Sequence, residues 1–313
     1  MPFARRYPGH GPFEEVWFCE VRITPDRGLW FRYTITDSAD PTSPFRHTAV
    51  WAMPFWRDKA LGFREKHDLS LLEANEGYAL GNNVLTADGA DGSAGDVSWS
   101  LKFTDRGASH NHVPKFIGML PIKRRNYVPA IFDLRVNGHV QIGDERIEVT
   151  DGHGVLGHIW GSANTTKTWA WTHANTFESD PDAIFESLGV LLDRPILRTR
   201  PFTSMVLRTG GQTYPFTTTL GCFQARSEWG ARRWSFGSKS GGMELEGEAE
   251  LPAEAVRVTY TKPDGSLIYC ENSRFCKLTV RLKGNGVDTE LSTTDAAFEI
   301  GSREPLPNLH LEG

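Results

Sequence analysis

The sequence predicts an all-β protein made of two antiparallel β units joined by a short helix. Runs of alternating polar and apolar residues, with the period of a β-strand, recur along the 313 residues. Turns rich in Gly and Pro separate these runs. A single segment has helical periodicity, so the regular alternation of strands and helices that a parallel sheet needs is missing.

The predicted strands are short and closely spaced in both halves of the chain. Residues 25–28, PDRG, place Pro and Gly where a hairpin needs them, and a Gly-Gly pair at 210–211 marks another hairpin. The runs with strand character are 15–24, 29–37, 47–56, 97–105, 131–138, 139–150, 154–160, 168–177, 202–216, 220–229, 242–251, 255–270 and 276–284. This spacing is typical of an antiparallel sandwich or barrel.

The segment 179–195, SDPDAIFESLGVLLDRP, interrupts the strands and predicts the helix. Ser179 or Asp180 can cap it, Pro181 suits its first position, and Ile184, Phe185 and Leu188 follow a helical spacing. We place a domain boundary there. The expected domains are residues 1–179 and 180–313, each an antiparallel β unit.

Charge and hydropathy exclude several classes of partner. The formal net charge is −5 and basic residues are distributed along the chain, so we expect no nucleic-acid partner. No apolar run reaches the ~18 residues of a membrane span, and the N-terminal residues lack the apolar core of a signal peptide. We therefore expect a cytoplasmic protein with no integral membrane segment. We expect the few cysteines to be reduced: Cys19, Cys222, Cys270 and Cys276.

No motif for a cofactor stands out. Residues 152–157, GHGVLG, have the glycine spacing of a dinucleotide site, but they lead into strand-like residues instead of a helix. His110 and His112 have a metal-like spacing without a third ligand nearby. Nucleophile-elbow, P-loop and zinc-protease motifs are missing from the sequence. We expect neither an organic cofactor nor a metal.

The stretch TWAWTHANTF, residues 168–177, alternates without interruption. Trp169, Trp171, His173, Asn175 and Phe177 fall on one face if the stretch is a strand. Burying the His and Asn would cost about 1–3 kcal/mol each unless they find partners.

The preceding run 154–160 carries a second set of chemically active side chains. We expect it to be the antiparallel neighbour of 168–177. His158 and Trp160 would then face the same cavity as His173, and the aromatic wall would suit a mostly apolar ligand with a few polar atoms. The alternative is structural, since such residues are also ordinary in a sandwich core.

Residues 137–177 resemble the central signature of the tocopherol cyclase-like and carotenoid 1,2-hydratase-like proteins, which have a lipocalin-like (calycin) fold. The matching residues are Gly152, Gly154, Trp160, Gly161, Trp169, Trp171, Asn175 and Phe177. The resemblance implies two packed lipocalin-like units that hold a hydrophobic ligand. Members of that family that are enzymes protonate, hydrate or cyclise isoprenoid chains, and similar fungal proteins shape polyenes for cycloaddition.

One position departs from the family pattern. Three residues before Trp160 the enzymes usually have an acidic residue, whereas this chain has Gly157, although His158 matches the family's histidine. Acid catalysis then needs another proton donor in a dry site. His158, His173 and Asp151 are the candidates, and the sequence does not choose among them.

These observations lead to a functional hypothesis and its rivals. The leading hypothesis is a cofactor-independent enzyme, of the cyclase or hydratase type and hence an isomerase or lyase, acting on a hydrophobic isoprenoid- or polyketide-like molecule. His158, His173 and Asp151 are its candidate catalytic residues. The candidate ligand-binding residues are Trp160, Trp169, Trp171, Asn175 and Phe177. The rivals are a non-catalytic lipocalin-like carrier of an apolar ligand and a purely structural module. The sequence predicts no oligomeric state.

Overall fold

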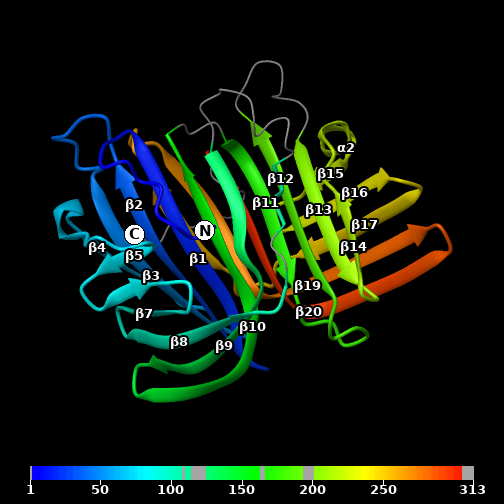
Figure 1. Ribbon diagram of the computed structural model, residues 1–313, viewed down its shortest axis with the longest axis horizontal. Helices are drawn as coiled ribbons and strands as arrows, with labels where there is room; N and C mark the ends of the chain where they lie inside the picture. Colours follow the sequence, from blue (N-terminus) through cyan, green and yellow to red (C-terminus); the bar gives the residue numbers. More distant parts are fainter. Residues whose placement is uncertain (1, 108–109, 114–124, 163–165, 193–200, 305–313) are drawn as a thin grey trace. The chain divides into compact units, whose positions relative to one another are not determined.

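The protein is built almost entirely of antiparallel strands, which confirms the all-β class (Figure 1). The computed structural model describes residues 2–107, 110–113, 125–162, 166–192 and 201–304. Contacts divide these residues into two units. The first unit contains 2–107, 110–111, 125–162 and the short segment 261–267, and the second contains 112–113, 166–192, 201–260 and 268–304.

The first unit contains one sheet of ten strands among the described residues. In chain order they are β1 (Phe13–Thr24), β2 (Arg27–Asp37), β3 (His47–Trp56), β4 (Phe63–His67), β5 (Tyr78–Leu80), β6 (Asn83–Leu85), β7 (Gly89–Ala94), β8 (Val97–Asp105), β9 (Arg125–Ile142) and β10 (Glu145–Gly161). In space the order is β4-β3-β2-β1-β10-β9-β8-β7-β6-β5, and a 3₁₀ turn, η1 (Leu69–Leu71), precedes β5. The N-terminal hairpin β1–β2 follows the predicted PDRG turn.

The first sheet curls back on itself, so that hydrogen bonds from side chains connect strands that are distant in the sheet order. The Tyr33 hydroxyl on β2 donates to the carbonyl of Asp91 on β7 at 2.7 Å. The backbone N–H of Gly95, just after β7, donates to Glu65 on β4 at 2.9 Å. The curl encloses an apolar core of aromatic and aliphatic residues, in which Phe31 stacks on Trp99 with ring centroids 4.8 Å apart.

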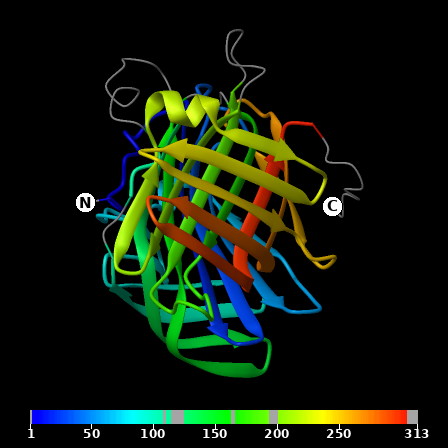
Figure 2. The ribbon, with the colours of Figure 1, turned by 90° about the vertical axis from the view of Figure 1, so that its right-hand side faces the viewer.

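The second unit contains the other sheet. Its strands are β11 (Thr166–Ala174), β12 (Ile184–Leu192), β13 (Phe202–Thr209), β14 (Gln212–Phe216), β15 (Arg226–Trp229), β16 (Arg233–Ser240), β17 (Met243–Glu250), β18 (Val256–Thr261), β19 (Leu267–Gly284) and β20 (Val287–Ser302). Their order is β14-β13-β12-β11-β20-β19-β17-β16-β15, with β18 paired to β19. Figure 2 shows these strands in green to red. Phe185, Phe236 and Phe298 belong to the core of this unit.

The predicted helix at 179–195 is wrong. Residues 184–192 form β12, which pairs with β11 and β13 on its two sides. The apolar residues Ile184 and Phe185 are adjacent because both faces of this strand are buried, and a continuous apolar run does not distinguish such a strand from a helix. Asp180 caps no helix; its carboxylate accepts from the Thr209 hydroxyl at 2.6 Å. The predicted boundary between residues 179 and 180, which rested on the helix, falls within the second unit.

The α-helix of the described residues is α2 (Thr219–Gln224), which lies beside the yellow strands in Figure 2. The strand predicted at 220–229 is thus helical in its first part, and residues 226–229 form β15. The Thr218 side chain caps the helix by accepting from the N–H of Gly221. No helix in the described part of the chain is long and apolar enough to cross a membrane.

The expected pairing of 154–160 with 168–177 is also wrong. The first stretch belongs to β10, whose two edges pair with β1 and β9. The second belongs to β11, which pairs with β12 and β20. Because both edges of each strand are already hydrogen-bonded, β10 and β11 cannot pair with each other. His158 and His173 therefore lie in different sheets.

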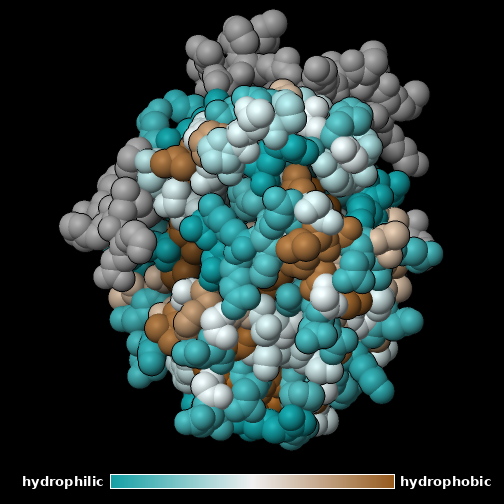
Figure 3. Space-filling model, turned by 90° about the vertical axis from the view of Figure 1, so that its left-hand side faces the viewer, coloured by the Kyte–Doolittle hydropathy of each residue, from teal (hydrophilic) through white to brown (hydrophobic). Residues whose placement is uncertain are grey.

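Central strands of both sheets are buried on both faces. In β1, β2 and β3 nearly every residue is buried, whereas antiparallel sheets commonly expose one face to water. We call the face toward a unit's apolar core the inner face and the opposite one the outer face. The four large apolar side chains exposed among the described residues are Leu61, Leu71, Leu220 and Leu267. Figure 3 shows one side of the molecule, on which hydrophilic and hydrophobic residues are interspersed.

The hydroxyl of Tyr33 should contribute measurably to the closure of the first sheet. It accepts from the Trp99 indole N–H at 3.0 Å and donates to Asp91. Tyr33→Phe should lower the free energy of unfolding by about 1–3 kcal/mol, because two buried polar groups lose their partner. Urea denaturation measures this loss. The same change at Tyr214, on the partly exposed strand β14, should have a smaller effect, and equal losses would contradict the role of Tyr33.

Candidate functional site

From Ala170 to Ala174 both faces of β11 are buried. Ala170 and Ala174 point into the core of the second unit, while Trp171 and His173 lie on the outer face with 4% and 1% of their surfaces exposed. Asn175, just beyond the strand, is fully buried. Phe177 packs into the apolar core and does not continue the row of Trp171 and His173.

The outer face beside β11 carries a buried carboxylate. Glu186 on β12 lies opposite His173 in the strand register. The Trp171 indole N–H donates to the Glu186 carboxylate at 2.8 Å, and the rings of Trp171 and His173 are nearly parallel with centroids 6.2 Å apart. Glu186 is fully buried. An indole donor thus orients a carboxylate that is excluded from water.

A second imidazole completes this group. His112 comes from the described segment 110–113, and its Nε2 lies 3.5 Å from the Glu186 carboxylate. Its Nδ1 is 2.9 Å from the Ser204 hydroxyl on β13. His112 is fully buried as well. We call His112, Trp171, His173, Glu186 and Ser204 the Glu186 cluster.

Three members of the Glu186 cluster, Glu186, His112 and Ser204, were not predicted as site residues from the sequence. Glu186 fell in the predicted helix, where a charged residue reads as solvent-exposed. His112 was considered only with His110 as a weak metal pair. The described residues hold no group of three or more His, Cys, Asp or Glu that could bind a metal. Polar and apolar residues do not alternate along 184–188, so no strand signal in the sequence pointed to Glu186.

The outer face continues to β20 and β19. The Trp169 indole N–H donates to Glu299 at 2.5 Å, and its ring packs over Gly301, where a Cβ would come within 2.5 Å of the ring. Asn272 on β19 lies opposite Glu299 in the register and is fully buried. Polar atoms and indole rings therefore alternate across this buried face.

His158 belongs to a different arrangement, on the inner face of the first sheet. Its Nε2 is 2.8 Å from the Glu15 carboxylate and its Nδ1 is 2.7 Å from the carbonyl of Pro2. Both ring nitrogens of His158 are therefore within hydrogen-bond distance of an oxygen. The ring stacks on Trp17 at 5.0 Å and lies 4.6 Å from that of Trp160. We call Glu15, Trp17, His158 and Trp160 the His158 cluster.

The His158 cluster holds the N-terminal segment. The Glu15 carboxylate accepts the backbone N–H groups of Arg6 at 2.6 Å and Tyr7 at 2.7 Å. The Trp17 indole donates to the carbonyl of Phe3 at 2.7 Å. These contacts engage main-chain atoms along residues 2–7, so the cluster works as a clamp on the chain terminus.

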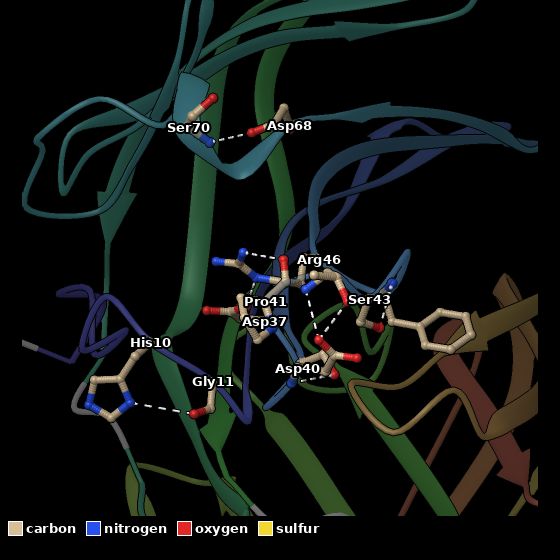
Figure 4. A network of polar contacts seen from close by, with 12 residues as sticks. His10, Gly11, Asp37, Asp40, Pro41, Ser43, Arg46, Asp68 and Ser70 are labelled. Atoms are coloured by element: carbon tan, nitrogen blue, oxygen red, sulfur yellow. Dashed lines mark hydrogen bonds and ion pairs between the residues drawn. The ribbon is translucent and has the colours of Figure 1, made fainter.

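Further polar contacts extend this attachment. The Tyr7 hydroxyl donates to Asp37 at 2.5 Å, and burial together with this bond raises the pKa of Tyr7 to about 12. Arg46 donates to the other Asp37 oxygen at 2.6 Å and to the carbonyl of Pro41 at 2.9 Å, as Figure 4 shows. The carboxylate of Asp40 accepts from Thr42 in the same loop. The network fixes the loop between β2 and β3.

Gly157 and Asp151 both lie on β10, Gly157 against the buried Phe18 ring and Asp151 at an exposed bulge. A Cβ at Gly157 would lie 2.2 Å from the Phe18 ring, so an acidic residue here would require the Phe18 ring to move. Glu15, from the neighbouring strand, supplies a carboxylate to His158 instead. Asp151 lies at a bulge with φ +52°, and its side chain is 65% exposed, 3.5 Å from Arg135.

A third group of charges lies on the outer face of the first sheet. The Glu14 carboxylate contacts Arg125 at 2.7 Å and Lys262 at 2.9 Å. Burial alone would raise the pKa of Glu14, but Arg125 and Lys262 together lower it to about 2. Burial and the nearby Arg125 lower the pKa of Lys262 to about 8, although Glu14 acts in the opposite direction.

Comparisons with known proteins agree with the fold and the resemblance. The sequence model of the family described as tocopherol cyclase-like matches residues 119–302. An uncharacterised protein of Mycobacterium tuberculosis, Rv0493c of strain H37Rv, is 27% identical over an alignment of 290 residues, and the match covers 89% of this chain and 84% of the relative. The corresponding protein of strain CDC 1551, MT0513, matches equally.

Three solved structures are similar over nearly the whole chain. CghA with Sch210972 has a TM-score of 0.61 and 10% identity, covering 97% of this chain and 96% of CghA. An AttH candidate from Nitrosomonas europaea has a TM-score of 0.58 and 16% identity, covering 96% and 97%. Kievitone hydratase from Nectria haematococca has a TM-score of 0.58 and 11% identity, covering 96% and 92%. At these identities the likeness shows the shared fold.

Removing the Glu15 charge should release the N-terminal segment. Glu15→Gln replaces an acceptor of two backbone N–H groups and of His158, so the free energy of unfolding should fall by about 3 kcal/mol. Trypsin should then cleave faster after Arg5 or Arg6. Mass spectrometry of a limited digest follows that cleavage. Glu148→Gln, at a carboxylate 69% exposed, is the control, and equal cleavage in both variants would contradict the clamp.

Lys262 should give stability a rising dependence on pH. Its pKa is about 8 in the folded protein and 10.5 ordinarily, so between these values the unfolded chain binds more protons. The free energy of unfolding should therefore rise from pH 8 to pH 10 through this group. Lys262→Met should lose that contribution and the exposed Lys102→Met should keep it, as urea denaturation at the two pH values would show. Identical slopes in wild type and Lys262→Met would refute the assignment.

Proposed function

Because the chain belongs to the tocopherol cyclase-like family, we propose that it is a cofactor-independent enzyme that cyclises, hydrates or isomerises a hydrophobic, isoprenoid- or polyketide-like small molecule. A hydratase and a protein solved with a small organic molecule share its fold, which supports this class of ligand. These reactions need a proton delivered to, or removed from, a mostly apolar molecule. The site must therefore hold an acid or base away from water.

The Glu186 cluster is the observation that carries the proposal. Glu186 and His112 are fully buried, and their facing atoms are 3.5 Å apart, so a proton can be shared between a carboxylate and an imidazole. Trp171 fixes the carboxylate through its indole N–H. In this proposal Glu186 exchanges the proton with the substrate, and His112 supplies or receives it.

The aromatic neighbours have a supporting role. His173 and Trp171 present parallel rings on the same outer face as Glu186. Indole rings stabilise positive charge that develops on a polyene or isoprenoid carbon. We assign the ligand wall to Trp169 and Trp171, and assign Asn175 to a polar atom of the ligand.

The remaining residues predicted from sequence receive other roles. Both ring nitrogens of His158 are engaged, and Trp160 packs on that ring, so we assign this pair to positioning the N-terminal segment. Asp151 is exposed and lies beside Arg135 and His153, which suits neither a dry site nor a strong acid. Phe177 stabilises the core.

Replacing the Glu186 acid should stop turnover while preserving the fold. Glu186→Gln keeps the size and the acceptor for Trp171 but cannot release a proton at neutral pH, so kcat should fall at least 100-fold. The measurement is organic extraction of the purified proteins with mass spectrometry. Wild type should yield one compound, and the variant should yield its isomer or its dehydrated relative.

The matched control is Glu271→Gln, a buried carboxylate of the same unit that pairs with Arg257 at 2.6 Å. Its extract should match that of wild type. If Glu186→Gln yields the wild-type compound as well, the proton-transfer role is wrong. The protein would then be a carrier that leaves its ligand unaltered.

A further inference from the structure

Ser204 and Cys222 extend the Glu186 cluster into a chain of hydrogen bonds within the second unit. The Ser204 hydroxyl on β13 lies 2.9 Å from Nδ1 of His112. It also hydrogen-bonds to the thiol of Cys222. Cys222 is the buried residue of the helix α2, and its Sγ donates to the backbone carbonyl of Phe216 at 3.7 Å. The hydrogen-bond chain thus leads from the imidazole beside Glu186 to a backbone carbonyl.

The hydrogen-bond chain is excluded from water, since His112, Ser204 and Cys222 are fully buried. Burial raises the pKa of the Cys222 thiol to about 12, although the hydrogen bond from Ser204 acts in the opposite direction. The thiol therefore keeps its proton at neutral pH, and it can donate through S–H while its sulfur accepts. Buried hydrogen bonds in series polarise and strengthen one another.

The backbone carbonyl at the end fixes the direction of every bond in the hydrogen-bond chain, because a carbonyl can only accept. The S–H proton of Cys222 points to Phe216, so the sulfur accepts from the Ser204 hydroxyl. With its own proton on the sulfur, the Ser204 oxygen accepts from Nδ1–H of His112. Nε2 of His112 then remains for the Glu186 carboxylate, 3.5 Å away.

A proton on Nδ1 is what proton transfer at Nε2 requires. If Nδ1 carried no proton, loss of the Nε2 proton would leave an imidazolate, which is a far stronger base than a carboxylate. With Nδ1–H retained, the proton leaves Nε2 of the imidazolium, the bonding electron pair stays on Nε2, and the Glu186 carboxylate becomes the acid. The reverse step restores the charged pair, so no further reactant is consumed.

We propose that Ser204 is a positioning residue, whose hydroxyl accepts Nδ1–H of His112 and thereby keeps Nε2 for proton exchange with Glu186. Cys222 orients that hydroxyl through its sulfur. An acceptor on the far nitrogen holds a buried histidine in one tautomer. The inference rests on the proposed function in one respect, that the proton exchanged at Nε2 is the one delivered to or taken from the substrate.

Nitrogen NMR of protein labelled at histidine reads this tautomer, because protonated and unprotonated ring nitrogens have well-separated chemical shifts. The chain has 10 histidines, and His112→Gln identifies the signals of His112. In wild type at neutral pH, Nδ1 of His112 should carry a proton. In Ser204→Ala, the ratio of forms protonated on Nδ1 to the form protonated on Nε2 alone should fall about fivefold, as expected for the loss of one buried hydrogen bond. Ser204→Thr keeps the hydroxyl and should retain the wild-type ratio.

Cysteine variants test the orientation of the Ser204 hydroxyl. Cys222→Ala removes the acceptor of the Ser204 proton, which can then turn toward Nδ1, so the same ratio should fall. Cys222→Ser should preserve the ratio, because a hydroxyl both accepts and donates. The matched control is Cys276→Ala, since Cys276 is a fully buried core cysteine of the same unit whose Sγ donates to the carbonyl of Ser273 at 3.3 Å. The signals of His112 should not change in this control.

Three results would overturn the proposal. The first is a wild-type His112 that carries its proton on Nε2 alone, because Ser204 would then be the donor. The others are an unchanged ratio in Ser204→Ala and an unchanged ratio in Cys222→Ala. If Ser204→Ala fails to fold, the wild-type tautomer and Cys222→Ala decide the question.

The spectra require no turnover, so this inference and the proposed function fail separately. If the tautomer is as proposed but Glu186→Gln yields the wild-type extract, the proton transfer to the substrate is wrong and the assignment of Ser204 to the tautomer stands. If the extract changes but the tautomer is reversed, the proposed function stands without this positioning of His112.

Discussion

Burial of both faces of the central strands is the constraint on which the rest of the structure depends. A strand with one solvated face can place polar side chains in water, but β1, β2 and β3 have no such face. Every polar residue on them must find a partner within the protein. Glu14 does so with Arg125 and Lys262, and Glu15 does so with His158 and two backbone N–H groups. The adjacent residues Glu14 and Glu15 thus have different partners on opposite faces of β1: ion pairs on the outer face and main-chain N–H groups on the inner face.

The inner and outer faces of the two sheets carry different kinds of side chain. The inner face of the first sheet encloses a core of large aromatic residues, and at one end the His158 cluster holds residues 2–7 against it. This packing fixes the orientation of the His158 ring, and both of its nitrogens have a hydrogen-bond partner. In the second unit the inner face is apolar, whereas the outer face carries Trp171, Glu186 and His112. Groups that can exchange a proton therefore lie opposite the core.

Local pattern in the sequence predicted the all-β class and much of the outer face of β11, but not the partners that complete it. Alternation placed Trp169, Trp171 and His173 on one face because a strand has a period of two. It could not predict that β10 pairs with β1 and β11 with β20, since those partners are more than 100 residues away in sequence. Glu15 and His112 were missed for the same reason. β12 was misassigned because burial on both faces removes the alternation that identifies a strand.

The departure from the family pattern at Gly157 is linked to the packing of the Phe18 ring against this position. A side chain at this position would collide with Phe18, and the Phe18 ring stacks on Tyr127 across the outer face. The acid usual in the family would therefore displace the Phe18 ring from its place on Tyr127. Glu15, the carboxylate beside His158 on the inner face, is engaged by main-chain contacts. Glu186, buried beside His112 and oriented by an indole N–H, is the acid to which we assign the proton transfer.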